Sequence, residues 1–103
     1  MIARLPAVGE GEFAATANGW TFAGTLTFAD AANVFAASGR LDLPGTGLVD
    51  LAGLEHADSS ALAVMLALKR RAVREGVRVV FTAIPPGVLA LARVYGIDEL
   101  LAS

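Results

Sequence analysis

The stretch HADSSALAVMLALKRRAVREG, residues 56–76, decides the fold, because it joins a helix-start signal to a long apolar helix. Asp58 stands where the helix should begin, and its carboxylate can accept the free backbone N–H groups of the first turn. The pattern predicts a helix over 59–75, with a glycine directly after it. Ser59 and Ser60 would then lie on the first turn, in positive dipole potential, where a hydroxyl is a candidate for phosphorylation or for contact with a partner. Taken alone, the triplet is better explained as an efficient N-cap and nothing more.

Placing one residue every 100° around the axis divides this helix into two faces. The predicted core face consists of Ala61, Leu62, Met65, Leu66, Ala72 and Val73. The predicted outer face consists of Ser59, Ser60, Ala63, Ala67, Arg70, Arg71 and Arg74. The alanines leave little relief, so another protein could approach closely there; alternatively, alanine is only a good helix former and the arginines complement the helix dipole. The serines favour the docking interpretation, and the predicted partner-binding residues are Asp58, Ser59, Ser60, Ala63, Ala67, Arg70 and Arg74.

The segments on either side of this helix carry strand and helix signals in a regular order. Asn18-Gly19 predicts a tight hairpin, because both residue types tolerate positive φ. The predicted elements are strands at 13–17 and 20–28, a helix at 30–38, a strand at 47–52, a loop at 53–57, the long helix, a strand at 77–83, a helix at 87–94 and a helical turn at 97–101. Strand–helix–strand units predict parallel pairing, and the hairpin adds an antiparallel pair. The expected fold is therefore α/β, a mixed sheet with helices packed against it in the order ββαβαβα.

Composition limits the class of protein. The 103 residues predict a single domain, with its core from about 13 to 101. Hydrophobic residues make up 55% and charged residues 17%, with a mean hydropathy of +0.61, so one face is expected to be covered by a partner. A net charge of −2 argues against nucleic-acid binding, and the absence of cysteine suits a reducing compartment.

Signals for catalysis, cofactors and membrane insertion are weak. His56 is the only histidine, and one histidine beside serines is not a triad, so no catalytic residue is predicted. No spacing suits a metal, and Gly45 and Gly47 are not followed by the Lys-Ser/Thr of a nucleotide loop, so no cofactor is expected. The N-terminus lacks the apolar core of a signal peptide, and the longest uncharged apolar run, 61–68, is too short to cross a bilayer. We expect a cytoplasmic protein that does not insert into the membrane.

The order of elements, the strand ending Val49-Asp50-Leu51 and the helix opening Asp58-Ser59-Ser60-Ala61-Leu62 together resemble the STAS domain, the fold of bacterial anti-sigma-factor antagonists. The similarity extends from about Phe13 to Leu101. In the antagonist branch, a kinase that is also an anti-sigma factor phosphorylates the first hydroxyl after the aspartate, which the resemblance assigns to Ser59. In a second branch, the STAS protein is a small subunit of the Mla phospholipid-transport ABC complex, and the same helix presses on the ATPase subunit and supports its activity.

The transporter branch is favoured by the short chain that begins close to the hairpin, by the C-terminal run Leu91-Ala92-Arg93-Val94-Tyr95-Gly96-Ile97, and by an alanine-rich surface that suits a permanent subunit. That branch implies an ABC-transporter ATPase as partner and a location at the inner membrane through the complex. Two positions depart from the family pattern. Ala61 stands where antagonists usually carry glycine, and Thr27 stands where many relatives have an acidic residue, which counts against kinase-type chemistry at Ser59.

Overall fold

The computed structural model describes residues 11–102, which form a four-stranded sheet in the order β1-β2-β3-β4. The strands are β1 (Glu12–Thr16), β2 (Gly19–Leu26), β3 (Leu48–Ala57) and β4 (Val80–Thr82). β1 pairs with β2 antiparallel, whereas β2 with β3 and β3 with β4 are parallel. The predicted mixed sheet and the element order are therefore confirmed.

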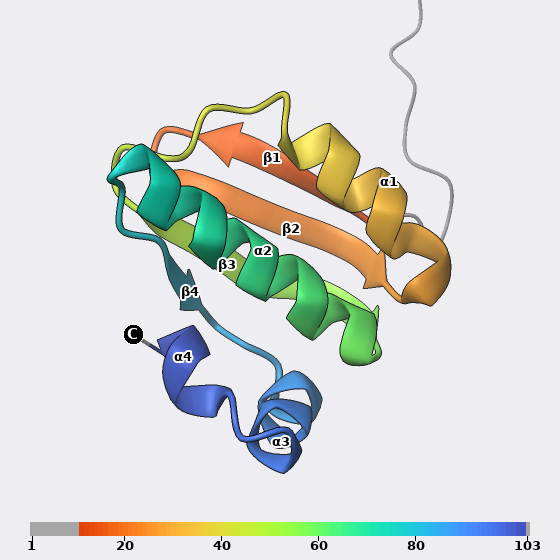
Figure 1. The fold of residues 1–103 in the computed structure, drawn as a ribbon. Coiled ribbons are helices and arrows are strands. Elements are labelled where there is room, and N and C mark those ends of the chain that lie inside the picture. Colours follow the sequence, from red (N-terminus) through yellow and green to blue (C-terminus); the bar gives the residue numbers. More distant parts are fainter. Residues whose placement is uncertain (1–10, 103) are drawn as a thin grey trace, which may run out of the picture.

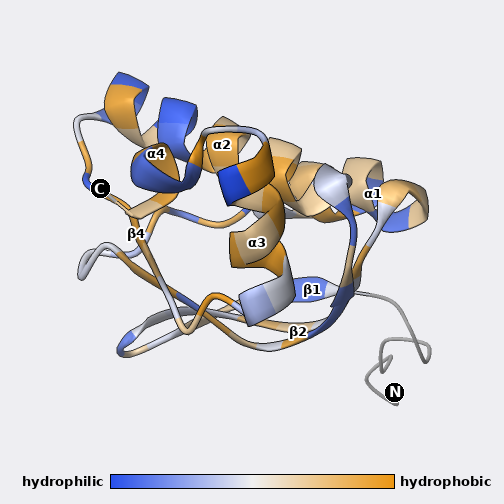
Figure 2. Ribbon diagram, turned by 90° about the horizontal axis from the view of Figure 1, so that it is seen from below, coloured by the Kyte–Doolittle hydropathy of each residue, from blue (hydrophilic) through white to orange (hydrophobic). Residues whose placement is uncertain are grey.

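Helices cover one face of this sheet. They are α1 (Phe28–Ser38), α2 (Ser59–Glu75), α3 (Pro86–Val94) and α4 (Asp98–Ala102). α1 and α2 contact each other and lie side by side over the strands, α4 lies beside β4, and α3 contacts α2 and α4 (Figure 1). The view along the layers places the helices on one side of β1 and β2 (Figure 2). α2 thus has an inner face against the sheet and an outer face directed away from it.

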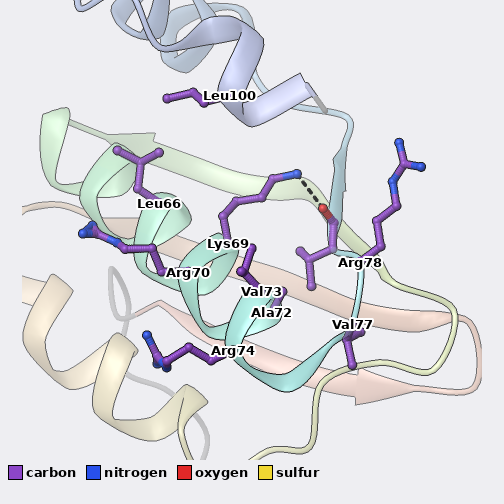
Figure 3. Close-up of a pocket in the computed structure, with 10 residues that line it drawn as sticks. Leu66, Lys69, Arg70, Ala72, Val73, Arg74, Val77, Arg78 and Leu100 are labelled. Atoms are coloured by element: carbon purple, nitrogen blue, oxygen red, sulfur yellow. Dashed lines mark hydrogen bonds between the residues drawn. The ribbon is translucent and has the colours of Figure 1, made fainter.

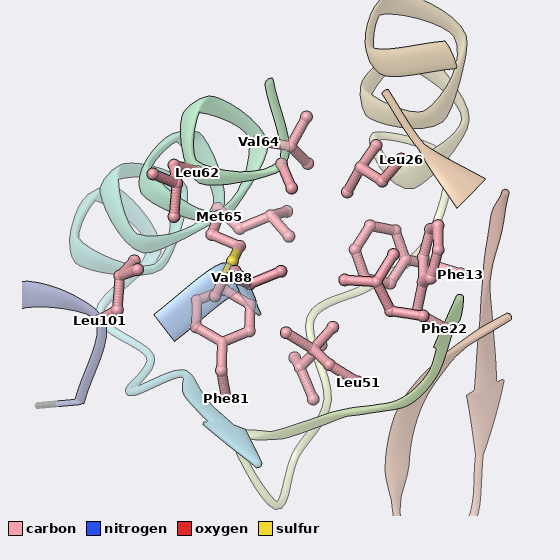
Figure 4. Packing of buried hydrophobic residues seen from close by; sticks show 14 of the residues in the cluster. Phe13, Phe22, Leu26, Leu51, Leu62, Val64, Met65, Phe81, Val88 and Leu101 are labelled. Atoms are coloured by element: carbon pink, nitrogen blue, oxygen red, sulfur yellow. The ribbon is translucent and has the colours of Figure 1, made fainter. Parts of the chain in front are cut away.

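The core fills the space between the sheet and α2. Trp20 and Phe22 alternate with more exposed residues along β2, as expected for a strand with one covered face. The ring of Phe13 packs on both, with centroids 5.4 Å from Trp20 and 4.9 Å from Phe22. Met65 of α2 lies over Phe81 of β4 in the same cluster (Figure 4).

The predicted loop at 53–57 is wrong, because β3 continues through it to Ala57. Its last residues pair with β2 through two register shifts, which interrupt the alternation that marks a strand in sequence. Gly53 lies against β2, and a Cβ there would stand 2.3 Å from the carbonyl oxygen of Phe22. Gly53, the first residue of the predicted loop, is instead part of the strand and is required by the close approach of two strands.

Several other predicted boundaries shift. The hairpin is confirmed, but its turn is formed by residues 17 and 18, one position earlier than predicted, with Gly19 in the strand at φ +135°. The strand predicted to reach Phe28 ends at Leu26, and α1 begins at Phe28 rather than at residue 30. The strand predicted at 77–83 shortens to β4. The two C-terminal helices agree with prediction to within one residue.

The predicted lack of a signal peptide concerns an N-terminal segment that lies mostly outside the described residues.

Candidate partner-binding surface

Asp58 joins the N-termini of two helices. One oxygen of its carboxylate accepts the backbone N–H of Ser60 at 2.8 Å, which confirms the predicted N-cap of α2. The other oxygen accepts the backbone N–H of Phe28, the first residue of α1, at 3.0 Å. These two bonds, first the one from Phe28, lower the pKa of Asp58, because they favour the charged carboxylate. A residue predicted to cap one helix therefore holds two.

The two serines after Asp58 differ in exposure. Ser59 is exposed on the first turn of α2, whereas Ser60 is half-buried. Within residues 11–102 the Ser59 hydroxyl makes no hydrogen bond. It therefore stands at the positive end of the helix dipole, open to a partner or to a modifying group.

The outer face of α2 continues from Ser59 as a shallow strip. Ala63 is exposed and Ala67 half-buried, and Arg70 and Arg74 at the C-terminal end are exposed. Of the predicted partner-binding residues, the structure thus brings Ser59, Ala63, Ala67, Arg70 and Arg74 onto the outer side of the helix, while Asp58 caps it and Ser60 is half-buried. Small side chains there let a facing backbone come close, and the two guanidinium groups at the end can pair with carboxylates.

Arg71, predicted for the same face, is engaged within the protein. Its guanidinium donates to the carbonyl oxygens of Ser38 at 3.1 Å and Leu41 at 2.8 Å, and pairs with Glu75 at 2.7 Å. Its predicted place on an open basic face is wrong, because the chain leaving α1 passes close enough to be held by this side chain.

The predicted core face also needs correction, because it includes one exposed residue and one that is only half-buried, Leu66, and omits two buried ones. Ala61, Leu62, Met65 and Ala72 are buried as predicted, but Val73 is 80% exposed. Val64 and Leu68 are buried instead. The reason is that α2 is covered on one side by α1 as well as by the sheet, so that its buried arc is rotated relative to the one inferred for an isolated helix.

A carboxylate lies at the end of β2, where the sequence suggested only Thr27. Asp30 accepts hydrogen bonds from the hydroxyls of Thr25 at 2.7 Å and Thr27 at 2.9 Å, and from the Thr27 backbone at 3.3 Å. These bonds, with that from Thr25 the largest, lower the pKa of Asp30. The signal that could have found it is the capping-box spacing of Thr27 and Asp30, which also places the start of α1.

Phe28 is an apolar residue of this surface that the sequence did not reveal. Its side chain is 85% exposed, although its backbone N–H is bound to Asp58 beside Ser59. Exposed aromatic side chains of this kind are enriched at the centres of protein interfaces. The candidate surface is therefore formed by the start of α1 together with the outer face of α2.

Other kinds of site find little support in the described part of the chain. Among residues 11–102, no group of three or more His, Cys, Asp or Glu side chains could hold a metal ion. His56 lies exposed on β3, paired in register with Thr25. In the same residues, no helix has the length and apolar character needed to cross a membrane.

Comparison with known proteins agrees with this architecture. The family model described as "Mlab, STAS domain" matches residues 19–102. No curated protein matches the chain significantly. The family match spans the sheet from β2 onward and all four helices, including the whole candidate surface. The chain therefore belongs to the STAS-domain family, of the MlaB type.

Proposed function

We propose that this protein is a non-enzymatic binding subunit that docks on the cytoplasmic ATPase of a phospholipid-transport ABC system. The family description, which names an Mla-type STAS domain, supports this class of partner. A docking subunit needs an open, shaped surface rather than reacting groups, and this is what the α1–α2 end of the molecule offers.

The observation that carries the proposal is the outer face of α2. Ser59, Ala63 and Arg70 are exposed along it, and the exposed residue Phe28 lies close to its N-terminal end, because the backbone N–H of Phe28 binds Asp58. The aromatic ring supplies an anchor, the alanine allows close approach, and the arginine supplies a charged contact at the rim.

Binding alone is sufficient to support the ATPase. A subunit that binds the assembled, active conformation more tightly than other conformations raises the population of that conformation by mass action. The subunit needs no chemistry of its own, and it would be held at the inner face of the membrane through its partner, without inserting into the bilayer.

A second candidate function is that of an anti-sigma-factor antagonist switched by phosphorylation. The observation that favours it is the exposed hydroxyl of Ser59 at the N-terminus of α2. A phosphate there would add about −1.5 to −2 charge at pH 7 and would change the docking of a partner. The partner in this case would be a kinase that also binds a sigma factor.

The test is affinity purification of the tagged full chain from its native host, with the bound proteins identified by mass spectrometry. An ABC ATPase together with its permease would support the transporter proposal, and Ser59→Glu should then weaken the purified complex and its ATPase stimulation. Unchanged binding by Ser59→Glu would contradict the proposed surface. A kinase-like anti-sigma factor, with a mass shift of one phosphate on Ser59, would support the second function and overturn the first.

A further inference from the structure

A groove of about 780 Å³ lies on the molecule away from Ser59, between the C-terminal half of α2, the segment that enters β4, and α4 (Figure 3). Its surface is mainly apolar. Val73 and Leu100 line it with exposures of 80% and 58%, and Leu66 and Val77 contribute half-buried side chains. Several solvent-exposed apolar side chains that line one groove are typical of an interaction site.

The charged residues that line this groove are all cationic. Four of the eight lysine and arginine residues of the chain line the groove, namely Lys69, Arg70, Arg74 and Arg78. No aspartate or glutamate is among the described residues that line it, although the chain as a whole carries a net charge of −2. The charged part of the lining therefore carries the opposite sign to the net charge of the chain.

The cations stand on both sides of the groove. Figure 3 shows Arg70 and Arg74 directed to one side of α2, and Arg78 on the other side, with Val73 between them. The pKa of Lys69 is lowered, first by burial and then by the positive charge of Arg78. Lys69 donates a hydrogen bond to the carbonyl oxygen of Val79, so the exposed cations that an anionic partner would meet are Arg70, Arg74 and Arg78.

We propose that this groove binds an acidic amphipathic helix of a protein partner. Apolar side chains from one face of that helix would lie on Val73, Val77 and Leu100. Carboxylates on both flanks of its apolar stripe would pair with Arg70 and Arg74 on one side and with Arg78 on the other. This is the helix-in-groove mode of recognition, with charge selecting the partner.

Exposed apolar residues with arginines on two sides match a helix whose apolar stripe is flanked by carboxylates, whereas an anionic membrane would be met chiefly by the arginines. The site also differs from the surface proposed to bind the ATPase. Arg70 and Arg74 border both, but Val73, Arg78 and Leu100 belong to the groove alone. Substitutions at Val73, Arg78 or Leu100 therefore alter the groove alone, and a substitution at Ser59 alters the ATPase-binding surface alone.

The test uses a capped 16-residue helical peptide with leucines at helical spacing flanked by glutamates, and a counterpart with lysines in their place. Binding to the full chain is measured by fluorescence anisotropy, and the site is located by amide chemical-shift changes. The glutamate peptide should bind, shift amides at 66–79 and around Leu100, and bind more weakly as salt is raised. Arg78→Glu should weaken binding about tenfold, because it replaces attraction by repulsion. Val73→Ser should do so to a similar extent by removing apolar contact.

Two controls make the test specific. Arg40→Glu reverses an exposed arginine outside the groove and should change the affinity less than twofold. Ser59→Glu, which tests the ATPase-binding surface, should also leave peptide binding unchanged. Equal binding of the lysine peptide, or full binding by Arg78→Glu, would overturn the proposal. Binding of phosphatidylglycerol vesicles through Arg78, without binding of the glutamate peptide, would overturn it in favour of a membrane-facing surface.

Discussion

Replacing Arg71 by methionine should destabilise the fold by removing the link between α2 and the chain that leaves α1. The side chain of Arg71 is 16% exposed, and its two bonds to the carbonyl oxygens of Ser38 and Leu41 are charge-assisted, each worth about 1.5–3 kcal/mol. Water can reach part of these carbonyls once the guanidinium is gone, so about 2–3 kcal/mol of the free energy of unfolding should be lost. Methionine keeps the unbranched stem, so the loss of packing is small.

The matched control is Glu75→Gln, which removes only the exposed ion pair of the same arginine. The side chain of Glu75 is 46% exposed, and an exposed pair four residues apart on a helix is worth about 0.3–0.5 kcal/mol. The comparison of the two variants therefore separates the bonds to the carbonyls from the ion pair.

The assay is urea denaturation followed by tryptophan fluorescence, since Trp20 is buried and donates its indole N–H to the carbonyl oxygen of Asp42. Amide hydrogen exchange adds a local measurement: segment 39–47 should exchange faster in Arg71→Met than in the wild type. A loss below about 0.5 kcal/mol in Arg71→Met, equal to that in Glu75→Gln, would refute the reasoning, because the bonds to the carbonyls would then contribute nothing.

Three further predictions follow from other parts of the structure. Gly53→Ala should lower the free energy of unfolding by about 2–3 kcal/mol, because a Cβ would stand 2.3 Å from a backbone oxygen that cannot move aside; an unchanged urea midpoint would contradict this. Ala63→Glu should weaken binding of the purified ATPase about tenfold or more, by calorimetry, while Ala36→Glu, the same change at an exposed alanine of α1, should not; equal effects would argue against the outer face of α2. The pKa values of Asp30 and Asp58 are lowered in the folded state, so their stabilising effect is present above the usual value of 3.8 and is lost as the pH falls through the lower folded values. Asp58→Asn, which keeps a capping oxygen but cannot titrate, should make the decline of stability in acid shallower, and an unchanged acid profile would count against the assigned cause.

The long helix was the most predictable part of the molecule. Its start at Ser59 and its end before Gly76 agree with the structure, because Asp58 and the glycine at φ +68° are local signals that act on neighbouring backbone. The strands were less predictable. The predicted strand ended before Gly53, whereas β3 continues beyond it. The pairing of these last residues depends on a distant strand, which leaves no local pattern in the sequence.

The sequence predicted the small residues of the candidate surface but not its aromatic residue. Ser59 and Ala63 follow from the periodicity of a single helix. Phe28 belongs to this surface because the carboxylate of Asp58 binds its backbone N–H. Arg71 is not part of it, because its guanidinium binds the carbonyl oxygen of Leu41 in the segment after α1. Contacts of this kind depend on the tertiary fold and cannot be inferred from spacing along one helix.

The two hydrogen bonds of Asp58 affect the free energy with which a partner binds. Because one carboxylate holds the first residues of both α1 and α2, Phe28 and Ser59 are presented to a partner in a fixed spatial relation before any encounter. A partner then loses little free energy in ordering this end of the molecule, and more of the contact energy appears as affinity. Removing the carboxylate would leave the side chains of Phe28 and Ser59 unchanged and should still weaken binding, because a partner would then have to order two helix ends that are no longer joined.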